Sequence, residues 1–284
     1  MSAKVYINGR IVAGNKARVS VFDSGLCFGY GLFETMKVDG GSILFFDEHI
    51  RRLKSGARDL GIKTPTKKEL ALAINKLLKA NNNFKGTIRL KIMITAGELA
   101  FGSKPTSKPT VIITTEEVDT EALQKRLEKG ITAVTLRAPE FALREPSSAH
   151  IKNLNYLPSI LGRAHATKQR AAEGIFIDTK GRVLEGTASN VFIVKGRRII
   201  TPPLYGILPG VTRAVVIGLD KKIKEATATE RALFAADEAF VTGSTSGVVP
   251  LIKVDGKKVG SGKVGTITRS LQESYSGLVA KLTK

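Results

Sequence analysis

The chain has 284 residues, 42% of them hydrophobic, which is enough for one large or two ordinary domains with buried cores. No stretch is long and apolar enough to predict a membrane span, and a single cysteine excludes an internal disulfide framework, so we expect a cytoplasmic location. The net charge is +20, but the basic residues are scattered in pairs among few aromatics. We therefore expect no dedicated nucleic-acid or membrane partner, and the three histidines lack the spacing of metal ligands.

The first 60 residues predict two hairpins and a helix. Asn8–Gly9 lies between two apolar-rich arms, and Asp39–Gly40 repeats this pattern. Asp47 is then expected to cap a helix that Gly61 ends, because the apolar residues between them follow helical spacing.

A second helix, two strands and a domain boundary follow. Thr66 and Glu69 form a capping-box pattern ahead of a second helix. Residues 87–95 alternate between apolar and polar side chains, which predicts a strand with one buried face, and 111–114 predict another strand. We place a small α+β domain at residues 1–118, an interdomain linker at 119–125 and a larger domain at 126–284.

The second half alternates short strands with glycine turns and contains few helices. We expect one helix after Pro158, with apolar residues Ile160 and Leu161, another after Gly210, and a long closing helix. Many strands with a few packing helices predict a barrel-like second domain.

Two residues of this half stand out chemically. Lys152 lies in HIKNLNYL among leucine and isoleucine, and Glu185 follows in VLEGTASNVF at the end of a predicted strand. A desolvated amine attacks an aldehyde, and a carboxylate keeps a pyridine nitrogen protonated. A lysine and an acid around one helix therefore favour pyridoxal 5′-phosphate (PLP) chemistry.

Six segments in this order resemble one family, the class IV (fold-type IV) PLP-dependent aminotransferases. That family includes branched-chain aminotransferases, D-amino acid aminotransferases and 4-amino-4-deoxychorismate lyases. The resemblance implies a D-amino acid aminotransferase-like fold, with a small α/β sandwich-like domain and a larger pseudo-barrel domain, and a homodimer. The segments are residues 29–41, 47–57, 150–157, 183–192, 201–213 and 236–256.

The resemblance also implies roles for individual cofactor residues. Lys152 matches the Schiff-base lysine, and Glu185 matches the acid on the ring nitrogen. Tyr156 matches a tyrosine on the phenolic oxygen of the cofactor. The 5′-phosphate would be held by Arg52, whose fork suits a bidentate contact, by the helix start at Val211 and Thr212, and by Ser244 and Thr245.

The substrate residues are less defined. Phe28 and Phe33 match aromatic positions of the family's substrate pocket, and each is equally compatible with core packing. Arg89 matches a position where some relatives hold a carboxylate, and Thr245 also matches a substrate contact. Tyr30 replaces the aspartate of many relatives, and residues 95–102 lack an Arg-x-His carboxylate trap.

We expect an aminotransferase that moves an amino group between an amino acid and a 2-oxo acid, either 2-oxoglutarate or pyruvate. The EGTASN segment slightly favours D-amino acids. A branched-chain L-amino acid aminotransferase and an aminodeoxychorismate lyase remain alternatives. A basic nucleic-acid-binding protein without catalytic activity is a third hypothesis, and it predicts a colourless protein with salt-dependent DNA affinity.

Overall fold

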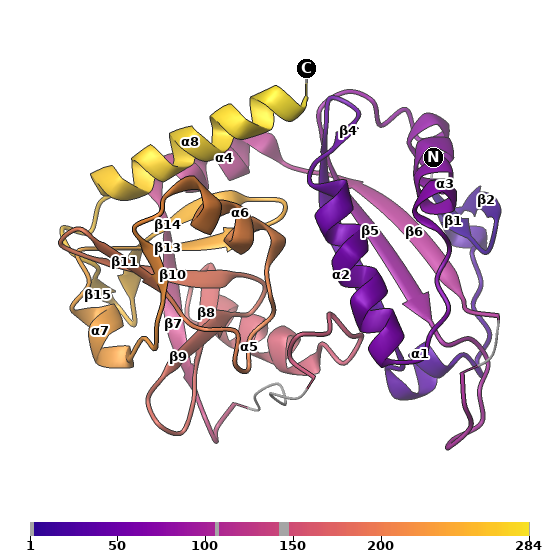
Figure 1. Ribbon diagram of the computed structural model, residues 1–284, viewed down its shortest axis with the longest axis horizontal. Coiled ribbons are helices and arrows are strands. Elements are labelled where there is room, and N and C mark those ends of the chain that lie inside the picture. Colours follow the sequence, from indigo (N-terminus) through magenta and orange to yellow (C-terminus); the bar gives the residue numbers. More distant parts are fainter. Residues whose placement is uncertain (1–2, 106–107, 142–147, 284) are drawn as a thin grey trace. The chain divides into compact units, whose positions relative to one another are not determined.

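The computed structural model describes residues 3–105, 108–141 and 148–283 (Figure 1). The chain forms two compact units: Met1–Val118 with Ile151–Asn155 and Leu282–Lys284, and Asp119–His150 with Tyr156–Lys281. Lys152 thus groups with the first unit, which differs from the boundary expected from the sequence. Within the described residues, no helix is both long and apolar enough to cross a membrane.

The first unit contains a six-stranded antiparallel sheet in the order β2-β1-β6-β5-β3-β4. Its two predicted hairpins are confirmed: Asn8 and Gly9, both with positive φ, join β1 to β2, and Gly40 and Gly41 join β3 to β4. The strands are β1 (Lys4–Ile7), β2 (Arg10–Ala13), β3 (Gly31–Asp39), β4 (Ser42–Ile43), β5 (Thr87–Thr95) and β6 (Val111–Glu117).

Two helices, α2 (Phe46–Asp59) and α3 (Lys67–Ala80), cover one face of this sheet (Figure 1). The apolar residues of β5 point into the core between sheet and helices, as the alternation predicted. The Thr66–Glu69 capping box of α3 is confirmed. The prediction that Asp47 caps α2 is wrong, because Phe45 is the cap and Asp47 lies in the first turn, where its charge still suits the helix dipole. A 3₁₀ helix (Gly14–Lys16) and a short helix, α1 (Ser24–Phe28), precede β3.

The second unit contains a nine-stranded sheet, six strands of which close into a ring. Neighbouring strands pair in the order β10-β13-β14-β7-β8-β9, and β9 pairs again with β10 through Glu185 and Asn190. The predicted pseudo-barrel is therefore confirmed. The strands are β7 (Ile131–Arg137), β8 (Glu173–Ile177), β9 (Val183–Gly186), β10 (Asn190–Lys195), β11 (Arg198–Thr201), β12 (Ile223–Glu225), β13 (Glu238–Gly243), β14 (Gly247–Val254) and β15 (Lys257–Lys258).

The helices of the second unit are α4 (Thr120–Lys129), α5 (Leu157–Lys168), α6 (Val211–Leu219), α7 (Glu230–Phe234) and α8 (Thr266–Leu282). Residues 119–125, expected to be a linker, form the cap and first turns of α4. In α5, Ile160 and Leu161 are more than half exposed, whereas Gly162 is buried. A Cβ at Gly162 would lie 2.5 Å from a methyl of Leu136 in β7, so small residues let this helix approach the barrel closely.

Candidate active site

The residues expected at the site belong to both units. The first unit holds Arg52, Phe28, Phe33, Arg89 and Lys152; the second holds Tyr156, Glu185, Val211, Thr212, Ser244 and Thr245.

Lys152 is held against β3 by backbone hydrogen bonds. Phe33 N–H donates to the Lys152 carbonyl at 2.8 Å, and Leu154 N–H donates to the Gly31 carbonyl at 3.0 Å. Ile151 is buried and anchors the same segment. The Lys152 amine lies 4.4 Å from the centre of the Phe33 ring. The sheet of the first unit thus positions both the lysine and an aromatic side chain beside its amine.

Arg52 belongs to a buried cluster that also contains Glu34 and His49. Arg52 Nε and Nη2 donate to the two carboxylate oxygens of Glu34, each at 2.7 Å, and His49 Nδ1 lies 2.7 Å from Glu34 Oε2. Burial alone raises the pKa of Glu34 and is the largest single influence, but Arg52 and His49 together outweigh it and lower the pKa to about 2. The fork fixes the plane of the Arg52 guanidinium, whereas its neighbour Arg51 is exposed.

The Glu34 cluster predicts a pH-dependent stability. Because its folded pKa lies below its ordinary value of 4.5, Glu34 stabilises the fold fully above that pH and loses this contribution as pH falls toward 2. Glu34→Gln is therefore expected to lower the free energy of unfolding by about 3 kcal/mol at pH 7, since it removes the negative charge that faces the guanidinium of Arg52. Urea unfolding across pH 2–7 measures the difference from wild type, which should shrink in acid. The exposed control Glu117→Gln should change stability little, and a pH-independent gap would contradict the argument.

In the second unit, Glu185 is buried at the point where the barrel closes. Its Oε2 accepts a hydrogen bond from Leu208 N–H at 2.9 Å and lies 3.3 Å from Asn190 Nδ2. Asn190 also donates to the Leu208 carbonyl at 3.0 Å. A Cβ at Gly210 would lie 2.0 Å from Asn190 Oδ1, so only glycine fits there. Asn190 therefore contacts both Glu185 and Gly210, the residue that caps α6.

The start of α6 provides groups that suit a phosphate. Gly210 caps the helix without a side-chain hydrogen bond, so the N–H groups of Val211 and Thr212 have no partner inside the helix. The hydroxyls of Thr212 and Thr242 are buried without a hydrogen bond of acceptable geometry within the described residues, although Thr212 lies beside Tyr275. Burial raises the pKa of Tyr275 to about 12, and the Thr212 hydroxyl opposes this rise.

Tyr275 also links this helix start to the turn that contains Ser244 and Thr245. A Cβ at Gly247, directly after that turn, would lie 3.0 Å from the Tyr275 ring. Ser244 and Thr245 are half-buried between β13 and β14. Within the second unit, Tyr275 therefore lies beside Thr212 and beside Gly247, the residue that follows this turn.

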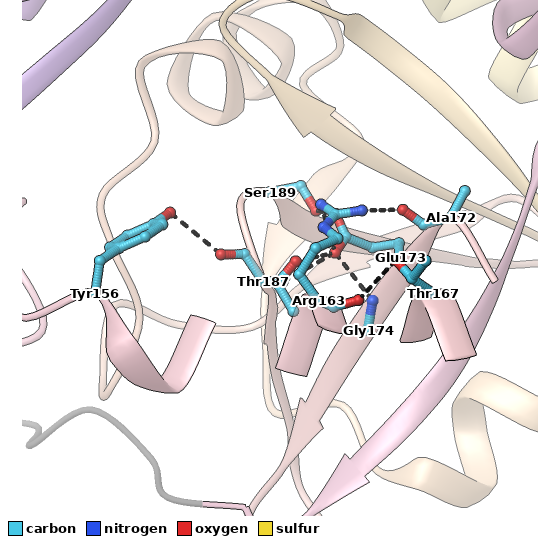
Figure 2. Close-up of polar contacts among 8 residues, drawn as sticks. All are labelled: Tyr156, Arg163, Thr167, Ala172, Glu173, Gly174, Thr187 and Ser189. Carbon is cyan, nitrogen blue, oxygen red and sulfur yellow. Dashed lines mark hydrogen bonds and ion pairs between the residues drawn. The ribbon is translucent and has the colours of Figure 1, made fainter. Parts of the chain in front are cut away.

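Glu173 organises the loop between β9 and β10, a role that the sequence analysis missed. Its buried carboxylate accepts hydrogen bonds from Thr187 N–H at 3.1 Å, from the Thr187 hydroxyl and from the Ser189 hydroxyl at 2.8 Å, and it pairs with Arg163 at 3.0 Å (Figure 2). The Thr187 carbonyl in turn accepts the Tyr156 hydroxyl at 3.2 Å. The predicted cofactor tyrosine is thus held by a loop that Glu173 fixes.

The sequence contains a signal for each of the two buried acids, Glu34 and Glu173. Glu34 occupies an inward position of β3, between apolar Leu32 and Met36, and Glu173 begins a strand that is otherwise apolar. A carboxylate in such a position requires partners when it is buried. What the sequence could not supply is the identity of those partners, since Thr187 and Ser189 lie far along the chain from Glu173.

The remaining predicted residues have ordinary surroundings. Phe28 is 47% exposed and meets Phe101 edge to face at 5.7 Å. Arg89 is exposed and pairs with Glu116 at 2.9 Å. Tyr30 donates its hydroxyl to the Leu60 carbonyl at 2.7 Å, so its phenol supports the end of α2.

Comparison with known proteins decides the family. Residues 31–254 match the family model of the class IV amino-transferases, which is more than half of the chain. The chain belongs to this family. It is therefore an aminotransferase of the two-domain fold that the resemblance implied, and that part of the expectation is confirmed.

Individual relatives differ in the activity that their names give. The chain is 36% identical to a putative branched-chain-amino-acid aminotransferase of Methanocaldococcus jannaschii, over 98% of this chain and 97% of the relative. It is 35% identical to an aminodeoxychorismate lyase of Bacillus subtilis (95% and 93%) and 35% identical to a D-alanine aminotransferase of Staphylococcus haemolyticus (96% and 96%). A solved branched-chain amino acid aminotransferase from Escherichia coli has a TM-score of 0.86 and 27% identity, with 98% and 94% covered.

The cofactor of this family is PLP, and the expected cofactor is confirmed for this class IV aminotransferase. The residues present fit it. The second unit offers a buried acid at Glu185. It also offers the start of α6, where Gly210 leaves no room for a Cβ, and two buried threonine hydroxyls, Thr212 and Thr242, that have no hydrogen-bond partner of good geometry among the described residues. When bound, PLP supplies an electron-accepting ring conjugated to an aldehyde carbon.

Proposed function

We propose that Lys152 is the residue that reacts with the cofactor and that Glu185 faces the cofactor's ring nitrogen. Arg52 and the α6 start at Val211 and Thr212, with Ser244 and Thr245, would hold the phosphate. Tyr156 would donate a hydrogen bond to the phenolic oxygen. The single observation that carries this proposal is that Asn190 contacts both Glu185 and Gly210, because it places the acid next to a helix start whose N–H groups suit an anion.

Each of these residues has a defined task in amino transfer. Lys152 Nζ accepts the proton from the substrate Cα and later returns it, as general base and then general acid. The carboxylate of Glu185 would favour the protonated ring nitrogen, which stabilises negative charge that develops at Cα. Arg52 and the α6 N–H groups fix the phosphate, which keeps the reacting atoms in register with Lys152.

For the substrates, we propose amino-group exchange between an amino acid and 2-oxoglutarate or pyruvate, with D-amino acids slightly favoured by the EGTASN segment. Branched-chain L-amino acids and elimination of pyruvate from aminodeoxychorismate are the alternatives, each supported by a relative of similar identity.

A donor screen separates these activities. Both enantiomers of alanine, glutamate, leucine and valine are offered with 2-oxoglutarate or pyruvate, and the amino acid formed is measured. Faster turnover of D-donors supports the proposal, whereas a preference for L-leucine and L-valine contradicts it. Pyruvate release from aminodeoxychorismate without an amino acceptor would assign the lyase activity instead.

We also propose a homodimer. The segment around α1 exposes several large apolar side chains, a concentration that is unusual for a surface without a partner. Phe22 is 70% exposed and Leu26 is 67% exposed, and Phe101 is 90% exposed beside Phe28. A monomer in sedimentation equilibrium at micromolar concentration would rule this out.

A further inference from the structure

The carboxylate of Glu173 joins three segments of the second unit (Figure 2). Arg163 in α5 pairs with it at 3.0 Å, and Gly174 N–H in β8 donates to it at 3.0 Å. The turn between β9 and β10 contributes the N–H and hydroxyl of Thr187 and the hydroxyl of Ser189. Because Glu173 is only 4% exposed, these partners replace the water that its charge would otherwise need.

Glu173 reaches both partners of the hydrogen bond between Tyr156 and Thr187. Tyr156 caps the start of α5, and Arg163 lies about two turns farther along the same helix. The Tyr156 hydroxyl donates to the Thr187 carbonyl at 3.2 Å, while the N–H and hydroxyl of Thr187 donate to Glu173. One carboxylate therefore holds the helix that Tyr156 begins, through Arg163, and also the residue whose carbonyl accepts the tyrosine's proton.

This hydrogen bond is suited to orienting the phenol and then being given up. A tyrosine hydroxyl has a single proton to donate, and a carbonyl oxygen can only accept it. The 3.2 Å separation is longer than the mode of about 2.7–2.8 Å for hydroxyl donors, so little free energy is lost when the proton turns away. A phenolate oxygen is a stronger acceptor than an amide carbonyl because it is charged. The Thr187 carbonyl thus holds the hydroxyl in place without competing strongly for its proton.

We propose that Glu173 is a positioning residue for Tyr156: by holding Thr187, it keeps the tyrosine hydroxyl ready to donate to the phenolic oxygen of PLP. This inference rests on the role proposed above for Tyr156. Glu173 acts through Thr187, so it is not itself a catalytic residue. Without Glu173, the N–H and hydroxyl of Thr187 lose a buried acceptor, and the carbonyl that orients the phenol is no longer fixed.

Substitutions at Thr187 test the inference without removing a buried charge. Thr187→Val keeps the shape and the backbone N–H but loses the hydroxyl that donates to Glu173, whereas Thr187→Ser keeps that hydroxyl and loses only a methyl group. Tyr156→Phe is the reference for complete loss of the phenol donor. Thr167→Val is the matched control, because the Thr167 hydroxyl is exposed and bonds to a backbone carbonyl within α5.

The first measurement uses the cofactor-free protein. Hydrogen exchange of the peptide that contains Thr187 reports how firmly the turn between β9 and β10 is held. We expect Thr187→Val and Glu173→Gln to raise its exchange rate about 10-fold, and Tyr156→Phe to raise it less, because Glu173 still holds the turn in that variant.

The second measurement is the pH dependence of the visible absorbance of the holoenzyme. A hydrogen-bond donor to the phenolic oxygen favours the ionised form of that oxygen, so loss of the donor alters the midpoint of the absorbance change. We expect Tyr156→Phe to raise the midpoint by about one pH unit, and Thr187→Val and Glu173→Gln to raise it by about half a unit. Thr187→Ser and Thr167→Val should stay near wild type.

A double variant shows whether Thr187 acts through the tyrosine. Thr187→Val added to Tyr156→Phe should cause no further shift of the midpoint, since the hydroxyl that Thr187 positions is already absent. An additive shift, a larger shift in Thr187→Ser than in Thr187→Val, or an unchanged midpoint in Thr187→Val while Tyr156→Phe shifts it would overturn the inference alone. If Tyr156→Phe itself leaves the midpoint unchanged, the proposed role of the tyrosine is rejected together with the inference.

Discussion

Lys152→Ala is expected to lower turnover by about 10⁴-fold or more, because on our proposal it removes both the amine that bonds to the cofactor and the base that moves the Cα proton. The visible absorbance of the covalently held cofactor should disappear, and borohydride should no longer attach a pyridoxyl group to this peptide. The fold should persist, since the hydrogen bond from Phe33 N–H is accepted by the Lys152 backbone carbonyl, which alanine retains. Turnover, absorbance and mass spectrometry of the reduced protein measure the three effects.

Lys168→Ala is the matched control. Lys168 is exposed in the last turn of α5, the helix that follows the Lys152 segment, so its loss tests the removal of a nearby lysine without a change at the site. Near-normal turnover in Lys152→Ala, or an adduct on another lysine in wild type, would show that the reacting amine lies elsewhere.

Local signals account for what the sequence predicted correctly about the fold. Asn8–Gly9 and the Thr66–Glu69 capping box each depend on residues that are close in sequence, and both are present as expected. The start of α2 was misplaced because the backbone of Phe45 adopts a left-handed conformation, which a phenylalanine in the sequence does not indicate. The helix after Pro158 was predicted from apolar residues that include Ile160, but Ile160 is exposed and the close approach of the helix to the barrel buries Gly162.

The site shows the same division between local and distant information. The helix start at Val211 and Thr212 follows from a glycine turn and was predicted residue by residue. Glu173 was missed because its function depends on Thr187 and Ser189, which only the closed barrel brings to it. Lys91 belongs to the polar face predicted for residues 87–95, but its proximity to Phe33 depends on the pairing register of β3 with β5. Patterns of residue type thus predict where helices and strands lie, whereas contacts between side chains on different strands can be identified only from the structure.

Glu185→Gln is expected to lower kcat by about 10²-fold to 10³-fold while the protein remains folded. The glutamine oxygen still accepts the Leu208 N–H, so the contact at the barrel closure survives and only the charge is lost. Without that charge, protonation of the ring nitrogen is no longer favoured, and negative charge at the substrate Cα is less stabilised. The expected signature is a fall in kcat with a larger primary isotope effect on removal of the Cα proton. The melting temperature of the cofactor-free protein should stay close to that of wild type.

The control for this variant is Glu273→Gln, an exposed residue of α8 that changes the net charge equally. It should leave kcat unchanged. Glu185→Ala provides the second comparison, because it removes the Leu208 acceptor as well as the charge, and it should lower both kcat and stability. If Glu185→Gln retained full kcat while Glu185→Ala lost only stability, Glu185 would serve the closure of the barrel and not the chemistry of the ring. If both variants lose kcat but only alanine loses stability, the charge and the barrel contact are separate contributions of one carboxylate.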